Sequence, residues 1–130
     1  MSTDPAPARG RGIENQRRAN LGDGTYCNPV MGGDYPDPTI LRVGERYYMT
    51  FSSFESSPAI VLFRSTNLVD WEPVGPVCPE PWGSVFAMDL IEHEGRFYLY
   101  IPFMPTSWSR VDEPTIAVMW SDDIEGEWNG

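Results

Sequence analysis

The sequence contains no lysine, a single histidine and only two cysteines. Cys27 and Cys78 do not form a CxxC pair, and His93 is the one imidazole of the chain. Neither a structural zinc site nor a cysteine–histidine nucleophile is therefore supported. We expect both cysteines to be buried free thiols, although the sequence leaves a disulfide between them open.

Long hydrophobic runs are absent as well. None approaches the roughly 20 residues that a membrane span needs, and the N-terminus lacks the apolar core of a signal peptide. The sequence therefore predicts no membrane partner. If Met1 is the true start, we expect a cytoplasmic protein, and an extracellular one stays open if the start is misassigned.

Because lysine is missing, all positive charge comes from nine arginines, which face nineteen acidic residues. Four of these arginines lie in residues 1–20, where the only acids are Asp4 and Glu14. The formal net charge of −10 is therefore concentrated in residues 21–130. An acidic body repels phosphate backbones, which argues against a nucleic-acid partner.

A sustained 3.6-residue pattern of apolar side chains is also missing, so we expect little helix. Residues 1–24 show no apolar periodicity at all, and we expect a flexible tail there, in front of a domain over residues 25–130. The chain has 13 prolines and 12 glycines, which indicates many turns. Between the turns lie β-branched and aromatic runs of strand length, the first four at residues 39–43, 47–51, 60–65 and 71–74.

The same order of residues occurs twice along the chain. Arg46-Tyr47-Tyr48-Met49 returns fifty residues later as Arg96-Phe97-Tyr98-Leu99. In residues 60–71, and again in 116–128, an apolar strand leads to a serine, an Asn or Asp, an aliphatic residue and a closing tryptophan. A repeat of about 50 residues with four short strands is typical of propeller blades. We therefore predict an all-β propeller fold, of which this chain supplies about two blades.

An aspartate precedes the first strand of each copy: Asp37 in the first and Asp89 in the second. Asp37 lies between Pro36 and Pro38. Because a proline pushes the residue before it into extended geometry, we expect a stiff, extended backbone at Asp37. A carboxylate held in this way at the mouth of a strand suits a general base, since proton transfer depends first on position. A simple turn is the alternative, because proline and aspartate are common turn residues.

Several stretches together resemble one known family. They are Asn28-Pro29-Val30, Asp34-Tyr35-Pro36-Asp37-Pro38-Thr39, Tyr47-Tyr48, Ser52-Ser53-Phe54-Glu55, residues 64–71 and Arg96-Phe97-Tyr98-Leu99-Tyr100. In these stretches, and over residues 26–128 as a whole, the chain resembles glycoside hydrolase family 43. Its members are five-bladed β-propellers that trim xylan and arabinan side chains and oligosaccharides. The resemblance implies that this chain supplies the first two blades, each a four-stranded antiparallel sheet.

The resemblance also implies an inverting hydrolase that uses three carboxylates. By position, Asp37 matches the general base that activates water, and Asp89 matches the aspartate that orients the general acid and modulates its pKa. Phe54 matches an aromatic residue of the sugar pocket, and Phe86 stands where the family more usually has a tryptophan. An inverting enzyme needs its acid and base about 6.5–9.5 Å apart, and the first strands of neighbouring blades converge on one funnel at the propeller axis.

The general acid of the family is a glutamate of the third blade, and no glutamate of this chain matches its position. We therefore expect the N-terminal part of a glycosidase, inactive alone, whose substrates are small plant-type oligosaccharides with terminal xylose or arabinofuranose. The resemblance implies no cofactor and no metal ligand in this chain, and it allows a structural calcium in the full-length fold. The acidic run Asp122-Asp123-Ile124-Glu125 is expected to be a solvated turn rather than a calcium site.

Two other functions stay open. One is a non-catalytic carbohydrate-binding or interaction propeller that kept the scaffold and lost the acid. The other is a five-bladed fructan-type hydrolase, whose first-blade motif differs from Tyr35-Pro36-Asp37-Pro38. The sugar, its linkage and the oligomeric state do not follow from the sequence, because fold-level analogy does not reach them.

Overall fold

A computed structural model describes residues 19–80, 82–105 and 114–130. These residues form two antiparallel β-sheets and no helix. Within them, accordingly, no helix is long and apolar enough to cross a membrane. The tail expected over residues 1–24 lies mostly outside the described residues. Its described end is a turn, closed by antiparallel pairing of Asn20 with Tyr26.

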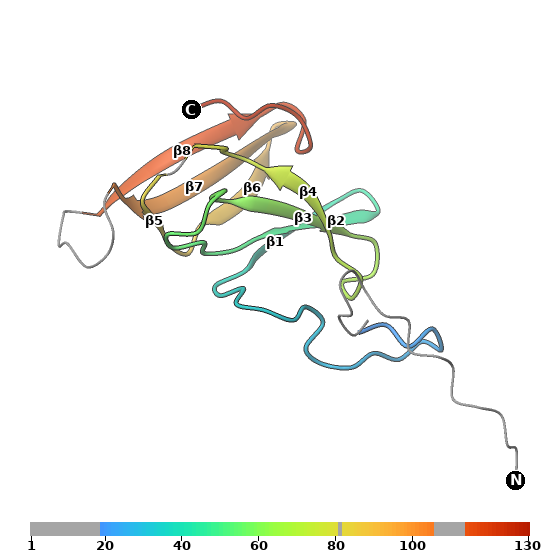
Figure 1. Ribbon diagram of the computed structural model, residues 1–130. Coiled ribbons are helices and arrows are strands. Elements are labelled where there is room, and N and C mark those ends of the chain that lie inside the picture. The colour runs from blue at the N-terminus through green and yellow to red at the C-terminus, as the bar shows by residue number, and fades with distance from the viewer. Residues whose placement is uncertain (1–18, 81, 106–113) are drawn as a thin grey trace, which may run out of the picture.

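The first sheet is a meander in which each strand pairs with the next along the chain (Figure 1). Its strands are β1 (Thr39–Val43), β2 (Arg46–Thr50), β3 (Val61–Ser65) and β4 (Glu72–Pro76). All four lie within two residues of the runs expected from the sequence. Gly44, at φ +60°, supplies the left-handed conformation that the tight β1–β2 turn requires.

The second sheet is built around one long central strand. Its strands are β5 (Ser84–Val85), β6 (Asp89–His93), β7 (Arg96–Met104) and β8 (Thr115–Ser121). β6 pairs with the first half of β7. On the same edge of β7, β5 pairs with the last two residues of β7, and β8 pairs along the opposite edge of β7. The last strand of this copy is represented only by a bridge between Trp120 and Asn129. The two-residue strand β5 was not expected from the sequence.

The turn that follows the third strand is built alike in both copies. Ser65 accepts a hydrogen bond from the Asn67 amide, and Ser121 accepts one from the Asp123 amide. The closing tryptophan then donates its indole N–H back into the turn, from Trp71 to the Leu68 carbonyl. In the second copy Trp128 donates to the Ile124 carbonyl in the same way. The tryptophans therefore lock equivalent turns, as expected for repeated blades.

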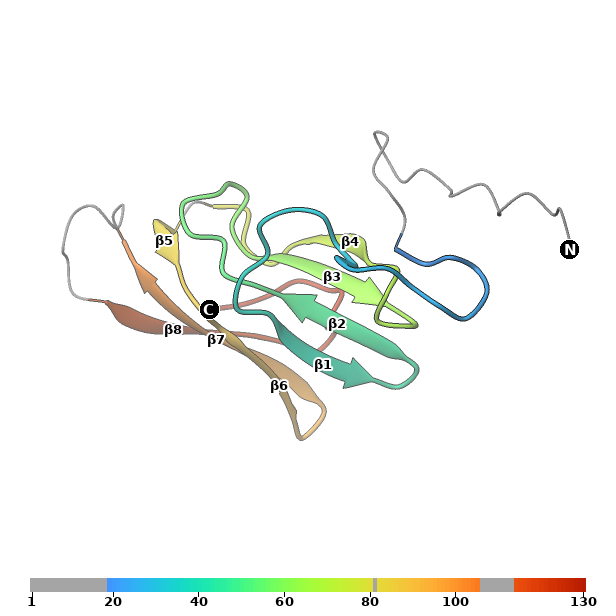
Figure 2. The same ribbon diagram turned by 90° about the horizontal axis from the view of Figure 1, so that it is seen from below.

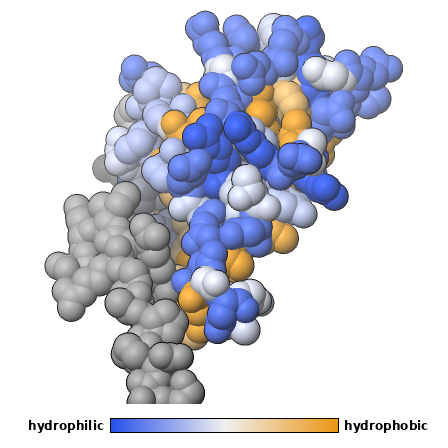
Figure 3. Space-filling model, turned by 90° about the vertical axis from the view of Figure 1, so that its right-hand side faces the viewer, coloured by the Kyte–Doolittle hydropathy of each residue, from blue (hydrophilic) through white to orange (hydrophobic). Residues whose placement is uncertain are grey.

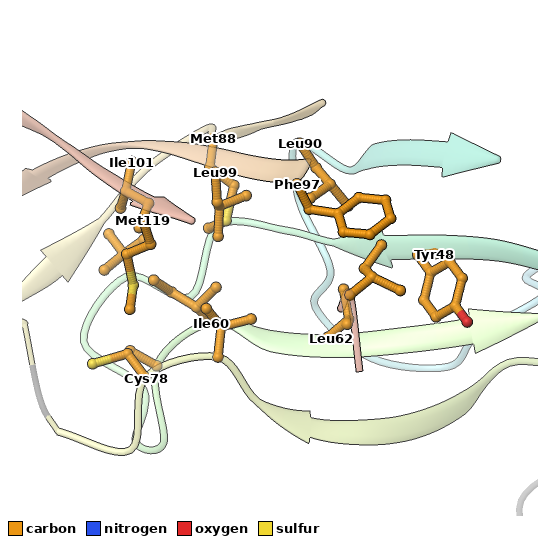
Figure 4. Packing of buried hydrophobic residues seen from close by; sticks show 14 residues of the cluster. Tyr48, Ile60, Leu62, Cys78, Met88, Leu90, Phe97, Leu99, Ile101 and Met119 are labelled. Carbon is orange, nitrogen blue, oxygen red and sulfur yellow. The ribbon is translucent and has the colours of Figure 1, made fainter. Parts of the chain in front are cut away.

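The hydrophobic core lies between the two sheets, which pack face to face (Figures 1 and 2). Residues of β7 alternate, so that Phe97, Leu99 and Ile101 are buried against the first sheet. Leu62 and Ile60 project toward them from the first sheet, as Figure 4 shows. The remaining buried members are Tyr48, Ala59, Val77, Cys78, Val85, Met88, Leu90, Met119 and Ile124. This shared core fixes one blade against the other.

The two outer faces of this pair of sheets differ in how they are covered. On the first sheet, the Tyr35 ring packs edge-on against Phe51, with ring centroids 4.7 Å apart. The outer face of the second sheet leaves Tyr100, Ile116 and Val118 exposed. Seen from the end that carries the β1–β2 turn, the surface is mostly hydrophilic, with smaller hydrophobic patches (Figure 3). The outer face of the second sheet is thus one of the places where apolar side chains are exposed.

Candidate active site

Asp37 lies on the segment that leads into β1, and its side chain is exposed. Its Oδ2 atom accepts a hydrogen bond of 2.8 Å from the hydroxyl of Ser52, which follows β2. The Ser52 amide donates to the Pro36 carbonyl at 3.0 Å. The end of β2 therefore fixes both the backbone before Asp37 and one of its carboxylate oxygens.

The backbone of Asp37 is not extended, which corrects the expectation drawn from the flanking prolines. Its φ is +53°, in the left-handed region. Aspartate is one of the few residues enriched there, because its short polar side chain can bond locally. The bond from Ser52 and the pairing of β1 with β2 outweigh the local preference imposed by Pro38. Backbone held in such a sparsely populated region is common at functional sites.

Asp89 is the first residue of β6 and is also exposed. Thr39, the first residue of β1, connects it to the first blade. The Thr39 hydroxyl donates to Oδ1 of Asp89 at 3.4 Å and accepts the Leu90 amide at 3.2 Å. Figure 2 shows β1 and β6 side by side, and the two strands are in contact. Since Thr39 is two residues beyond Asp37, the structure brings both aspartates to the same junction between the blades.

Phe54 and Phe86, the two aromatic residues nominated from the sequence, also meet. Phe54 forms a β-bridge with Val85, in which each backbone amide donates to the other residue's carbonyl at 2.9 and 3.0 Å. This bridge sets the Phe54 and Phe86 rings edge to face, with centroids 6.2 Å apart. The Phe54 ring is 39% exposed, although its φ of +46° is unusual for a bulky residue. An exposed aromatic edge and face of this kind suit the apolar faces of a sugar ring.

Two surface hollows lie in the first blade. One, of about 250 Å³, is bordered by Tyr35, Pro36, Phe51 and Phe54, and it adjoins the backbone that carries Asp37. The other, of about 270 Å³, lies along the outer strands beside Arg64 and Trp71 and includes none of the nominated residues. Only the first is therefore near the candidate site.

Glu125 is a charged residue whose role the sequence did not reveal. The expected solvated turn is wrong for it, because its carboxylate accepts hydrogen bonds from Tyr48 (2.6 Å), Arg64 (2.7 Å) and Arg46 (3.1 Å) of the first blade. The Tyr48 hydroxyl, followed by the charges of the two arginines, holds the pKa of the Glu125 carboxyl below its usual value. Burial, followed by the bond to Glu125, raises the pKa of Tyr48. The repeat could have drawn attention to this residue, because Glu125 occupies the position that Val69 has in the first copy.

No described group of three or more His, Cys, Asp or Glu side chains could hold a metal ion. Cys27 is half-buried and Cys78 is buried, and both are free thiols.

Comparisons with known proteins agree on one family. Residues 26–130 match the sequence profile described as glycosyl hydrolases family 43. A β-xylosidase of Bacillus subtilis is 47% identical over 115 residues, which are 78% of this chain and 21% of the relative. A β-xylosidase of Formosa agariphila is 36% identical over 83% of the chain and 19% of its own length. A non-reducing-end α-L-arabinofuranosidase of Bacteroides ovatus is 33% identical over 62% of the chain and 17% of its own length.

Solved structures give the same answer at the level of the fold. A family 43 protein of Bacillus licheniformis superposes with a TM-score of 0.65 at 34% identity, over 79% of this chain and 23% of that one. A xylan β-1,4-xylosidase of Bacillus halodurans superposes with a TM-score of 0.68 at 29% identity, over 78% of this chain and 21% of that one. The chain thus spans about a fifth of the length of such relatives, and its two sheets form part of their five-bladed propeller. The chain belongs to glycosyl hydrolases family 43.

Proposed function

We propose that this chain is part of an inverting glycoside hydrolase that removes terminal xylose or arabinofuranose from small plant-type oligosaccharides. Two of the three relatives named above are β-xylosidases and one is an arabinofuranosidase. The observation that carries the proposal is the junction of β1 with β6. There Asp37 lies two residues before β1, Asp89 begins the equivalent strand β6 of the next blade, and Thr39 of β1 bonds to Asp89 and Leu90.

In this proposal Asp37 is the general base. Its Oδ2 atom is bonded to Ser52, and Asp37 makes no other side-chain hydrogen bond within the described part of the chain. Oδ1 is thereby left to accept a proton from the attacking water. Such a proton transfer contributes typically 10²–10⁴-fold to a rate. The base needs no covalent bond to the sugar, because water attacks the face opposite the leaving group.

Asp89 acts on the general acid rather than on water, and the acid itself comes from a part of the propeller outside this chain. Phe54 and Phe86 supply the apolar surface on which the sugar ring rests, since their rings already pack against each other beside the bridge of Phe54 with Val85. A non-catalytic sugar-binding propeller would use the same aromatic pair and would not depend on Asp37.

The test is hydrolysis of nitrophenyl β-xyloside and nitrophenyl α-L-arabinofuranoside by the complete propeller that carries this chain. Asp37→Asn keeps the shape of the side chain and suits the left-handed backbone, so the protein should fold normally. Its kcat should fall by about 10³-fold, because amide nitrogen and oxygen cannot take the proton of water. Glu45→Gln, an exposed carboxylate in the β1–β2 turn at the other end of β1, is the control and should stay near the parent rate.

Near-normal turnover by Asp37→Asn would contradict the proposal. Sugar binding without any turnover in the parent protein would instead favour the non-catalytic propeller. Thermal melting of both variants separates a loss of chemistry from a loss of folding.

A further inference from the structure

Each candidate aspartate is held by a hydroxyl group of the first blade. Ser52 donates to Oδ2 of Asp37, and Thr39 donates to Oδ1 of Asp89. The sequence motifs singled out neither hydroxyl as functional. Both lie beside the junction at which β1 meets β6, so each is placed to control where a carboxylate points.

Ser52 holds Asp37 from two sides. It is buried, with 2% of its surface exposed, so its own position is fixed by packing. Its amide holds the Pro36 carbonyl and its hydroxyl holds the carboxylate. Asp37 has a left-handed backbone, a sparsely populated conformation that persists only where the surrounding structure enforces it. Ser52 is the described residue that contacts both the backbone before Asp37 and its side chain.

Thr39 joins the two blades at this point. Its hydroxyl accepts the Leu90 amide and donates to Asp89, so one oxygen fixes both the backbone and the side chain at the start of β6. Thr39 follows Asp37 by two residues on the same rigid segment. A displacement of Thr39 would therefore change the position of Asp89 relative to Asp37.

We propose that Ser52 and Thr39 are positioning residues of the hydrolysis, with Ser52 aiming Asp37 at water and Thr39 fixing Asp89 relative to it. The inference rests on the proposed function. An inverting reaction requires a defined separation of acid and base, with room for one water. A misplacement of about 1 Å can cost 10²-fold in rate, so two hydroxyls that set this geometry affect turnover without touching the substrate.

The chain offers a matched control for each hydroxyl. Ser53 and Thr50 carry the two hydroxyls that are buried without a hydrogen-bond partner among the described residues. Ser53 is the neighbour of Ser52, and Thr50 pairs directly with Thr39 across β1 and β2. Ser53→Ala and Thr50→Val thus remove the same atoms from the same region without removing a hydrogen bond.

We expect Ser52→Ala and Thr39→Val in the complete propeller to lower kcat by roughly 10- to 100-fold while KM changes by less than about twofold. Ser53→Ala and Thr50→Val should leave kcat within about twofold of the parent. Thr39→Ser keeps the hydroxyl and should restore the rate. Because Ser52 acts through Asp37, adding Ser52→Ala to Asp37→Asn should cause no further loss.

Equal kcat losses in Ser52→Ala and Ser53→Ala, or in Thr39→Val and Thr50→Val, would overturn the inference, since both hydroxyls would then be merely structural. A Thr39→Ser variant with a kcat as low as that of Thr39→Val would also overturn the inference. These results differ from a failure of the proposed function itself, which would appear as undiminished turnover by Asp37→Asn. Should Ser52→Ala fail to fold, Ser52→Cys, which keeps the volume and replaces the hydroxyl with a weak donor, takes its place with the same expected loss, while the Thr39 and Thr50 variants test the role of Thr39.

A direct readout is available in the complete propeller. Hydrogen exchange followed by NMR should show the Leu90 amide protected in the parent and in Thr39→Ser, and unprotected in Thr39→Val. The carboxyl carbon resonance of Asp89 should move in Thr39→Val only. An unchanged Leu90 amide and Asp89 resonance in Thr39→Val would overturn the role assigned to Thr39.

Discussion

The Glu125 carboxylate joins the two blades through three donors of the first sheet. It belongs to the turn after β8, and its partners Arg46, Tyr48 and Arg64 all come from β2 and β3. Arg64 also bonds to Glu72, so its charge is shared between two acids. Because this contact is only partly exposed, it is screened less than an ordinary surface ion pair. The residues concerned are therefore expected to affect stability measurably.

Tyr48→Phe tests this contact with the smallest change. The variant keeps the buried ring and removes the hydroxyl that donates to Glu125, and a hydrogen bond to a charged group contributes about 1.5–3 kcal/mol. We expect the free energy of unfolding, measured by urea denaturation, to fall by about that amount. Tyr47→Phe, on the opposite face of the same strand, is the control and should stay within about 0.5 kcal/mol of the parent. Equal effects of the two changes would contradict the account.

The same contact predicts how stability depends on pH. The pKa of Glu125 is lowered in the folded chain from its ordinary value of 4.5, so the stabilisation is fully present above that pH and is lost as the pH falls through the folded value. Glu125→Gln should therefore have a flatter profile of unfolding free energy in the acid range than the parent. Glu127→Gln, an exposed change in the same turn, should keep the parent profile. Parallel profiles for the parent and Glu125→Gln would refute this.

At the residue scale, the sequence nominated side chains but not the contacts that hold them. Asp37 and Asp89, taken from motif positions, lie where β1 meets β6, and the nominated Phe54 and Phe86 rings pack against each other. The left-handed backbone of Asp37 was not predictable, because it depends on Ser52, a residue 15 positions away. The conformational preference that a proline imposes depends only on its neighbours in the sequence, so it does not include the effect of Ser52.

At the scale of elements, β7 is the strand on which the second blade depends. It pairs with β5, β6 and β8, and its alternating residues fill the core between the sheets. Leu99→Ala removes a side chain that is fully buried in this core, and such changes cost about 2–5 kcal/mol. Glu45→Ala, an exposed change in the β1–β2 turn, should cost about 0.5 kcal/mol or less. Denaturant titration checks both, and similar losses would mean that the core lies elsewhere.

The strands of the first blade could be read from the sequence because β-branched and aromatic runs alternate with glycine- and proline-containing turns. The repeated serine and tryptophan turns also matched their structure, since these are local hydrogen-bond patterns. β5 was missed because a two-residue strand has no periodicity of its own. It forms only because Ser84 and Val85 find partners on β7 and, through the bridge to Phe54, on the first blade.

At the scale of the whole molecule, the two blades share one core and one junction of candidate catalytic residues. The family could be identified from the sequence because its motifs surround that junction. The contacts of the Thr39 and Ser52 hydroxyls could not be predicted from the sequence, because their partners become neighbours only when β1 packs beside β6 and the end of β2 folds back. The outer face of the second sheet leaves Tyr100, Ile116 and Val118 exposed.

The central claim is that Asp37 activates water rather than forming a bond to the sugar. Proton NMR of the first-formed product tests it most directly, with the complete propeller acting on a β-xyloside. The account predicts that α-xylose appears first and only later equilibrates, because water attacks the face opposite the leaving group. Initial release of β-xylose would require a covalent intermediate or a different mechanism, and would contradict the assignment of Asp37 as general base.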